Sequence, residues 1–157
     1  MMFQVLVDFL HLLATVTWIG GMIYINLVLM PAMPVLSPPE RGKLMGAASK
    51  RFALFAWGSI VILLLTGFYK TPEGMLFDVS ADYSLTLTVK HVVVLTMIII
   101  GIVISMVIVP KLGALAPKPQ EAPSPAFIAL QNRLKVLAII NMIMGFVVLL
   151  CVVLLQL

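Results

Sequence analysis

The sequence has little of what a soluble enzyme or a disulfide-bonded protein needs. Charged residues make up only 10% of its 157 residues, and there are one cysteine and two histidines. The single cysteine, Cys151, excludes an internal disulfide and a metal cluster built on cysteines. It lies in the last apolar run, where we expect it to pack as a small hydrophobic side chain. No phosphate-binding loop and no Ser/His/Asp arrangement is present, which argues against a kinase or a hydrolase.

What the sequence has in abundance is apolar side chains. They make up 62% of the residues, and the mean hydropathy is +1.19. Both values are typical of an integral membrane protein, so membrane lipid is the first expected partner. The net charge of +4 would suggest nucleic acid as the partner of a soluble protein. In a membrane protein it needs no such partner, because basic residues collect in the cytoplasmic loops.

Four apolar runs are each long enough to cross a bilayer, and they contain very few charges. We therefore predict an all-α integral membrane protein, a bundle of four transmembrane helices that forms a single domain over residues 1–157. The runs are Phe3 to Met30, Phe52 to Tyr69, Leu85 to Val109 and Val136 to Leu157.

Prolines and glycines predict where these helices end. Pro31 and Pro34 are expected to end the first helix, and Pro110 to end the third. Ser124 followed by Pro125 is typical of an N-cap and a first helical position, so the last helix should begin there, before its apolar part. No internal repeat rises above the general apolar pattern.

The distribution of basic residues predicts the orientation in the membrane. Eight of the ten flank the first and third connections, whereas the second connection is acidic. The positive-inside rule then places these two connections in the cytoplasm, and both termini and the second connection on the outer side of a cell inner or plasma membrane. The eight are Arg41, Lys43, Lys50, Arg51, Lys111, Lys118, Arg133 and Lys135, and the acidic residues are Glu73, Asp78 and Asp82.

The two histidines, His11 and His91, both lie inside predicted spans. Their helices run in the same direction, and we estimate depths of roughly 12 Å and 9 Å below the outer surface. Two imidazoles at matched depth on different helices suit the axial ligation of one haem b. Copper or another metal, a proton-linked role, and simple hydrogen bonding between helices are the alternatives.

Several neighbours could complete such a site. Asp8 and Thr15 are expected beside the His11 ring, where they could orient it, and Trp18 continues that helical face. The charge of Asp8 also suits the first turns of a helix. Lys70 and Lys90 are the cations nearest the outer surface, where they could hold haem propionates or simply reach the interface.

The eleven methionines invite a copper pathway, but they are scattered along the chain. Met22 lies eleven residues from His11, roughly 16 Å along a helix. Met142 and Met144 point about 200° apart, so they cannot share an ion. We therefore expect the methionines mostly to pack in the core, without forming a copper site together with the histidines.

The stretch from His11 to Tyr24, HLLATVTWIGGMIY, resembles the first helix of CopD-like copper-resistance membrane proteins. It is also similar to HemJ-type protoporphyrinogen oxidases. Arg51-Phe52 with Thr66-Gly67 looks like their second helix, and Lys90 matches a lysine of their third. The resemblance covers roughly the first 110 residues. It implies a four-helix membrane unit, with haem b in the HemJ branch and copper uptake or tolerance in the CopD branch.

Two positions depart from the HemJ pattern. Leu27 stands where that pattern has an arginine, and Thr88 stands where it has a histidine. Both departures argue against porphyrinogen oxidase activity, whereas the first-helix ligand, His11, is retained.

Three functions follow from the sequence. The preferred hypothesis is a haem b membrane protein that passes electrons to or from a quinone or a redox partner protein, with bis-histidine ligation. The alternatives are a copper transport or tolerance protein and a structural subunit without a cofactor. The sequence leaves open whether the chain is an enzyme and whether it forms a homo- or hetero-oligomer.

Overall fold

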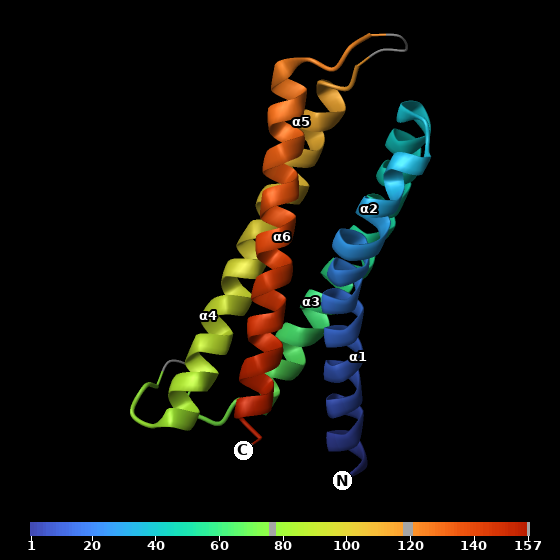
Figure 1. The fold of residues 1–157 in the computed structure, drawn as a ribbon. Helices are drawn as coiled ribbons and strands as arrows, with labels where there is room; N and C mark the ends of the chain where they lie inside the picture. Colours follow the sequence, from blue (N-terminus) through green and yellow to red (C-terminus); the bar gives the residue numbers. More distant parts are fainter. Residues whose placement is uncertain (76–77, 118–120, 157) are drawn as a thin grey trace.

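A computed structural model describes residues 1–75, 78–117 and 121–156 of the chain (Figure 1). Over these residues all the regular secondary structure is helical, and there is no strand. Four helical stretches are long and apolar enough to cross a membrane: Met2–Val35, Pro39–Lys70, Asp82–Ala114 and Pro125–Leu154. The predicted fold class, an all-α bundle of four membrane-spanning helices, is therefore confirmed.

Two of the four stretches are continuous α-helices, and the other two contain a five-residue π-helical segment. The first stretch consists of α1 (Met2–Tyr24), π-helix η1 (Ile25–Leu29), α2 (Met30–Ala32) and the 3₁₀ turn η2 (Met33–Val35). The second is α3 (Pro38–Lys70). The third consists of α4 (Asp82–Val103), π-helix η3 (Ile104–Ile108) and α5 (Val109–Ala114), and the fourth is α6 (Pro125–Leu154).

The prolines do not end the helices where the sequence predicted. The first stretch continues past Pro31 to Val35, and the third continues past Pro110 to Ala114. In a regular α-helix a proline ring collides with the carbonyl four residues before it. Here a π-helical segment precedes each proline, and the wider turn moves that carbonyl away. The expected loop from Pro31 to Arg51 is consequently mostly helical.

Serine residues fix the start of the two uninterrupted helices. The Ser124 hydroxyl accepts a hydrogen bond from the Phe127 amide at 3.2 Å, which confirms the predicted start of α6 at Pro125. At the start of α3, the Glu40 carboxylate accepts a hydrogen bond from the Ser37 amide at 3.0 Å. This arrangement is a capping box, and it lets α3 begin well before the apolar run at Phe52.

The four stretches form two helical hairpins. In one hairpin α1 packs against α3, and in the other α4 packs against α6; α1 and α6 join the two more sparsely (Figure 1). The π-helical segments occupy the same position in each hairpin, before a proline. Their sequences share an isoleucine, a valine and the proline, reading INLVLMP over Ile25–Pro31 and ISMVIVP over Ile104–Pro110.

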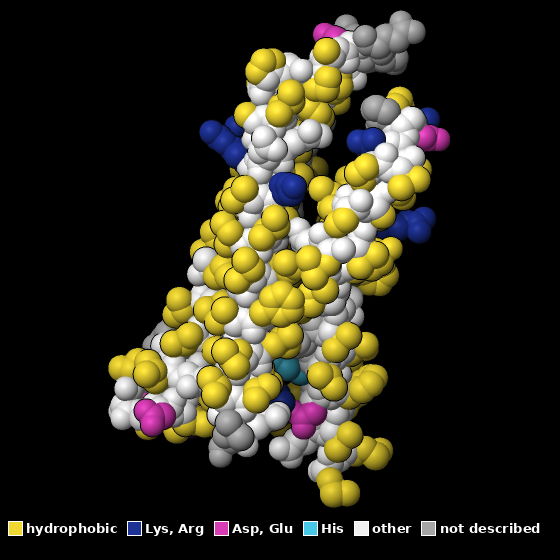
Figure 2. All heavy atoms as spheres, viewed as in Figure 1, with side chains coloured by type: hydrophobic (Ala, Val, Ile, Leu, Met, Phe, Trp, Pro, Cys, Tyr) yellow, Lys and Arg dark blue, Asp and Glu magenta, His cyan; other side chains and the backbone are white. Residues whose placement is uncertain are grey.

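The two ends of the bundle differ. Both chain termini lie at one end, the termini end, beside Lys70 and Asp82, where α3 finishes and α4 begins (Figure 1). At the opposite end, the basic end, Lys and Arg side chains gather on both hairpins, and the hairpins separate (Figure 2). Lys118 lies outside the described residues. The predicted orientation was based on this gathering of basic residues at one end. Which end faces the cytoplasm stays a prediction.

The core follows the seam between the hairpins. Its buried side chains form one apolar cluster, while most other large apolar side chains face outward, as expected for contact with lipid (Figure 2). A Cβ atom on Gly21 would lie 2.4 Å from the Phe52 ring, so glycine is what lets α1 and α3 pack this closely. The cluster comprises Trp18, Ile19, Met22, Ala56, Ile60, Met97, Met142 and Val148.

Candidate functional site

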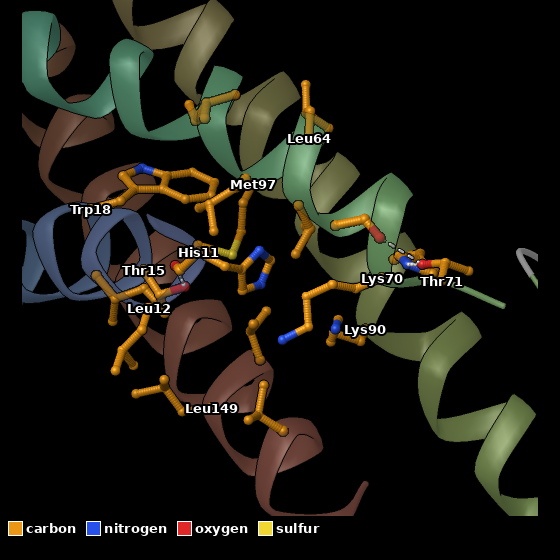
Figure 3. A pocket seen from close by; sticks show the side chains of 18 of the residues that line it. His11, Leu12, Thr15, Trp18, Leu64, Lys70, Thr71, Lys90, Met97 and Leu149 are labelled. Carbon is orange, nitrogen blue, oxygen red and sulfur yellow. Dashed lines mark hydrogen bonds between the residues drawn. The ribbon is translucent and has the colours of Figure 1, made fainter. Parts of the chain in front are cut away.

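A cavity of about 360 Å³ lies toward the termini end, enclosed by residues of α1, α3, α4 and α6 (Figure 3). Its size is that of a small-molecule site. Every site residue predicted from the sequence lines it, although they come from three different helices. These residues are Asp8, His11, Thr15, Trp18, Lys70, Lys90 and His91. Their location is thus established, whereas their roles stay predictions.

The ring of His11 is held by a residue that the site prediction did not include. His11 Nδ1 lies 2.7 Å from Thr66 Oγ1 of α3. The Thr66 hydroxyl gives its own proton to the Ile62 carbonyl at 2.6 Å, so it accepts the bond from His11 Nδ1–H. The unprotonated nitrogen of the ring is then Nε2, which is the arrangement of a metal-binding histidine fixed by an outer hydrogen bond.

The sequence suggested that Thr15 could orient the His11 ring, but the structure gives Thr15 another partner. Its hydroxyl donates to the His11 backbone carbonyl at 2.8 Å, which satisfies the hydroxyl within α1. Thr66 performs the role instead. The available signal was a threonine inside an apolar span, directly before Gly67; a Cβ atom on Gly67 would lie 3.7 Å from His11 Cε1.

His91 is held differently from His11. Its Nε2 atom lies 3.4 Å from Thr71 Oγ1, and the Thr71 hydroxyl itself donates to the Gly67 carbonyl at 2.9 Å. His91 Nε2–H therefore points toward Thr71, at the end of α3. The two histidines share one cavity, but only His11 is arranged to present Nε2 to a ligand there. Metal binding through His91 Nε2 would require the contact with Thr71 to break.

Charge in the cavity is unevenly balanced. Among the described residues that line it, one carboxylate, Asp8, faces two ammonium groups, Lys70 and Lys90. Lys70 Nζ lies 2.6 Å from Asp8 Oδ1, so Asp8 pairs with a lysine. Both side chains of this pair are about half exposed, at 44% and 53%. Lys90 leaves the cavity with an excess of positive charge.

The floor of the cavity consists of large buried side chains. Trp18, Ile19 and Ile60 are each 4% exposed, and Met97 is fully buried. Figure 3 shows His11, Trp18 and Met97 around the same space. Met97 belongs to the buried apolar cluster, as expected of the methionines, and it also lines the cavity that contains His11. Spacing along one helix could not reveal this shared cavity, because Met97 reaches it from α4 and His11 from α1.

Metal-binding side chains do not cluster in the described part of the chain. Within residues 1–75, 78–117 and 121–156, no three His, Cys, Asp or Glu side chains come together to hold an ion. The donors that the cavity does offer are imidazole nitrogen and thioether sulfur. Such donors suit a soft ion such as Cu(I), and imidazole also suits haem iron.

Comparison with known proteins identifies a family for this chain. Residues 46–155 match the family described as copper resistance protein D, whereas no curated protein and no solved structure matches the chain. The match includes α6, to which the sequence analysis gave little weight, and begins after His11. It covers Thr66, Lys90 and His91 together with most of three of the four spanning stretches. The chain is thus a multi-pass membrane protein that belongs to the copper resistance protein D family.

Proposed function

We propose that this chain is a copper-tolerance protein that binds Cu(I) in the cavity at the termini end, as cargo, through His11 and Met97. The observation that carries the proposal is the hydrogen bond from His11 Nδ1–H to Thr66, because it leaves Nε2 as the free donor of the ring. Met97 supplies a thioether in the same cavity. Membership of a family named for copper resistance points to the same metal.

The donor set favours the reduced ion. Cu(II) prefers several nitrogen and oxygen ligands in a tetragonal arrangement, and the described residues bring no such group together. Cu(I) is satisfied by fewer and softer ligands, so an imidazole with a thioether suits it better. The apolar floor under the two donors would exclude water and so keep the ion from hydration.

The experiment is a Cu(I) competition against a chromophoric chelator under anaerobic conditions. His11→Ala and Met97→Leu should each weaken Cu(I) binding strongly. Thr66→Val should weaken it by about 10- to 100-fold, since it removes the partner that fixes the ring. Thr96→Val is the matched control, because the exposed Thr96 hydroxyl also donates to a carbonyl of its own helix, at 2.9 Å, but meets no histidine.

Wild-type protein that binds no Cu(I), or a His11→Ala variant that binds it as tightly as wild type, would refute the proposal. Equal losses in Thr66→Val and Thr96→Val would show that the ring needs no fixing by Thr66. Copper tolerance of cells that express the same variants supplies an independent measurement, and it should fall in the order of the lost affinities.

A haem b protein is the second candidate, and the shared cavity is the observation that favours it. His11 and His91 both line it, its walls are otherwise largely apolar, and two lysines could hold acidic side arms. Such a group would supply one-electron redox chemistry, with a quinone or a redox protein as partner. His91 Nε2 would have to leave Thr71. An absorption spectrum of protein purified from haem-replete cells tests this, because a Soret band that is lost in both His11→Ala and His91→Ala would support haem.

A further inference from the structure

A second hollow, the α3 groove, lies on the surface of α3 toward the basic end of the bundle. It measures about 560 Å³, and all of its lining residues belong to this one helix. At about 100° per residue these positions share one side of α3, whereas Phe52 and Ala56, which pack inward, fall on the other side. The groove therefore faces away from the core. Its lining residues are Lys50, Arg51, Ala53, Leu54 and Trp57.

The length of α3 places the two cations of the groove at the edge of the bilayer. The hydrocarbon core of a membrane is about 30 Å thick, which corresponds to about 20 helical residues. Counting back about 20 residues from Lys70, at the termini end, leads to Lys50 and Arg51. The residues between Arg51 and Lys70 include no charged side chain. This part of α3 therefore crosses the hydrocarbon, and the part before Lys50 projects beyond it.

The two cations lack a partner within the protein. No carboxylate of the described residues pairs with Lys50 or Arg51. The carboxylate of α3 itself, Glu40, lies roughly 15 Å away along the helix axis. It is engaged at the helix start, where it accepts a hydrogen bond from the Ser37 amide at 3.0 Å. Two adjacent positive charges at the membrane edge are thus available to an anion from outside the chain.

Beyond the cations, the same side of α3 is apolar and exposed. Leu54 in the groove is 74% exposed, and Leu65 and Phe68 further along are 70% and 72% exposed. In a bilayer such a stripe contacts acyl chains. Trp57 lies between the charged and the apolar parts, and tryptophan is enriched where headgroups meet acyl chains. A ligand that satisfies both parts has an anionic head and an apolar chain.

From these observations we propose that the α3 groove binds an anionic phospholipid, with its phosphate at Lys50 and Arg51 and an acyl chain along Leu54 and Trp57. The Arg51 guanidinium can donate two parallel hydrogen bonds to phosphate oxygens, while Lys50 adds a point charge. A zwitterionic lipid carries its own cationic group, which the two side chains repel, so the groove selects lipids of net negative charge. This site is separate from the cavity that contains His11 and does not depend on the proposed copper function.

Trp57 makes the occupant of the groove directly observable. The chain has two tryptophans, so Trp18→Phe leaves Trp57 as the single fluorophore. This full-length variant is reconstituted into vesicles of phosphatidylglycerol and phosphatidylcholine in which one lipid or the other carries bromine on its acyl chains. Bromine quenches tryptophan fluorescence at short range, so the two sets of vesicles report which lipid lies against Trp57.

We expect phosphatidylglycerol to be preferred by about 10- to 25-fold, since each cation near a membrane surface contributes about fivefold. Lys50→Gln and Arg51→Gln should each lower this preference about fivefold. Arg51→Lys should retain most of it. Lys43→Gln is the matched control, because Lys43 is an exposed cation of the same helix and lies about 10 Å beyond Lys50. At physiological ionic strength charges are screened beyond about 8 Å, so Lys43→Gln should leave the preference nearly unchanged.

Four results would each overturn the proposal. Equal quenching by the two brominated lipids would show that the groove does not select negative charge. Equal losses in Lys43→Gln and Lys50→Gln would show that only the general surface charge matters. A preference that survives the double variant Lys50→Gln/Arg51→Gln would mean that another part of the chain attracts the lipid. No quenching by either lipid would mean that no acyl chain reaches Trp57.

Discussion

Lys90 offers the sharpest test of what the cavity holds, because copper and haem require opposite effects from its charge. A Cu(I) ion bound at His11 is repelled by the Lys90 ammonium group across the cavity. The acidic side arms of a haem would instead be attracted by it. Replacing Lys90 with leucine keeps an apolar side chain and removes the charge, without adding a sulfur ligand for copper. The substitution should therefore tighten copper binding and weaken haem binding.

The size of the effect on copper follows from the dimensions of the cavity. A volume of about 360 Å³ corresponds to a sphere roughly 9 Å across. Two unit charges about 9 Å apart at an effective dielectric constant of about 20 repel each other by roughly 1.8 kcal/mol, or about 20-fold in affinity. Lys90 is only partly buried, so solvent and salt reduce this value. We expect Lys90→Leu to tighten Cu(I) binding by about 3- to 20-fold at low ionic strength.

The assay is the Cu(I) competition on Lys90→Leu, with Lys90→Arg as the control that keeps the charge. Lys90→Arg should bind Cu(I) with nearly the affinity of the wild type. The gain in Lys90→Leu should shrink as salt is added, because the repulsion is electrostatic. Unchanged or weaker copper binding in Lys90→Leu would refute the electrostatic argument. A haem spectrum lost in Lys90→Leu and retained in Lys90→Arg would favour the second candidate function.

Two further predictions concern orientation and packing. In a Cys151→Ala background, a cysteine introduced at Ser80 should react with an impermeant reagent added outside the cell. A cysteine introduced at Ser124 should react only from the cytoplasmic side. Labelling at position 124 from outside would contradict the predicted orientation. Gly21→Ala should destabilise the bundle by about 1–3 kcal/mol, because its Cβ atom displaces the Phe52 ring. Phe52→Ala should relieve much of that cost in a double-mutant thermal unfolding cycle, and simple additivity of the two effects would contradict the contact.

The sequence alone determined the class of the protein and the approximate place of its spans. Lipid leaves no hydrogen-bond partner for the backbone, so long runs of apolar residues such as Leu85 to Val109 have to be helical. It also predicted that His11 and His91 lie at similar depth, from residue numbers along a helix alone; the structure shows that both line one cavity. The matching positions of Pro31 and Pro110 were visible too, but their preceding π-helical segments were not.

Tertiary structure decided which side chains meet. A bilayer gives every apolar helix face a suitable environment, so hydropathy does not reveal which face of a span turns inward. The contact of His11 with Thr66, the place of Met97 in the cavity and the pairing of Asn141 with Met22 each join different helices. Such contacts depend on how the two hairpins rotate and approach each other. Close packing at positions such as Gly21 sets that geometry, and the order of residues along any one helix does not contain it.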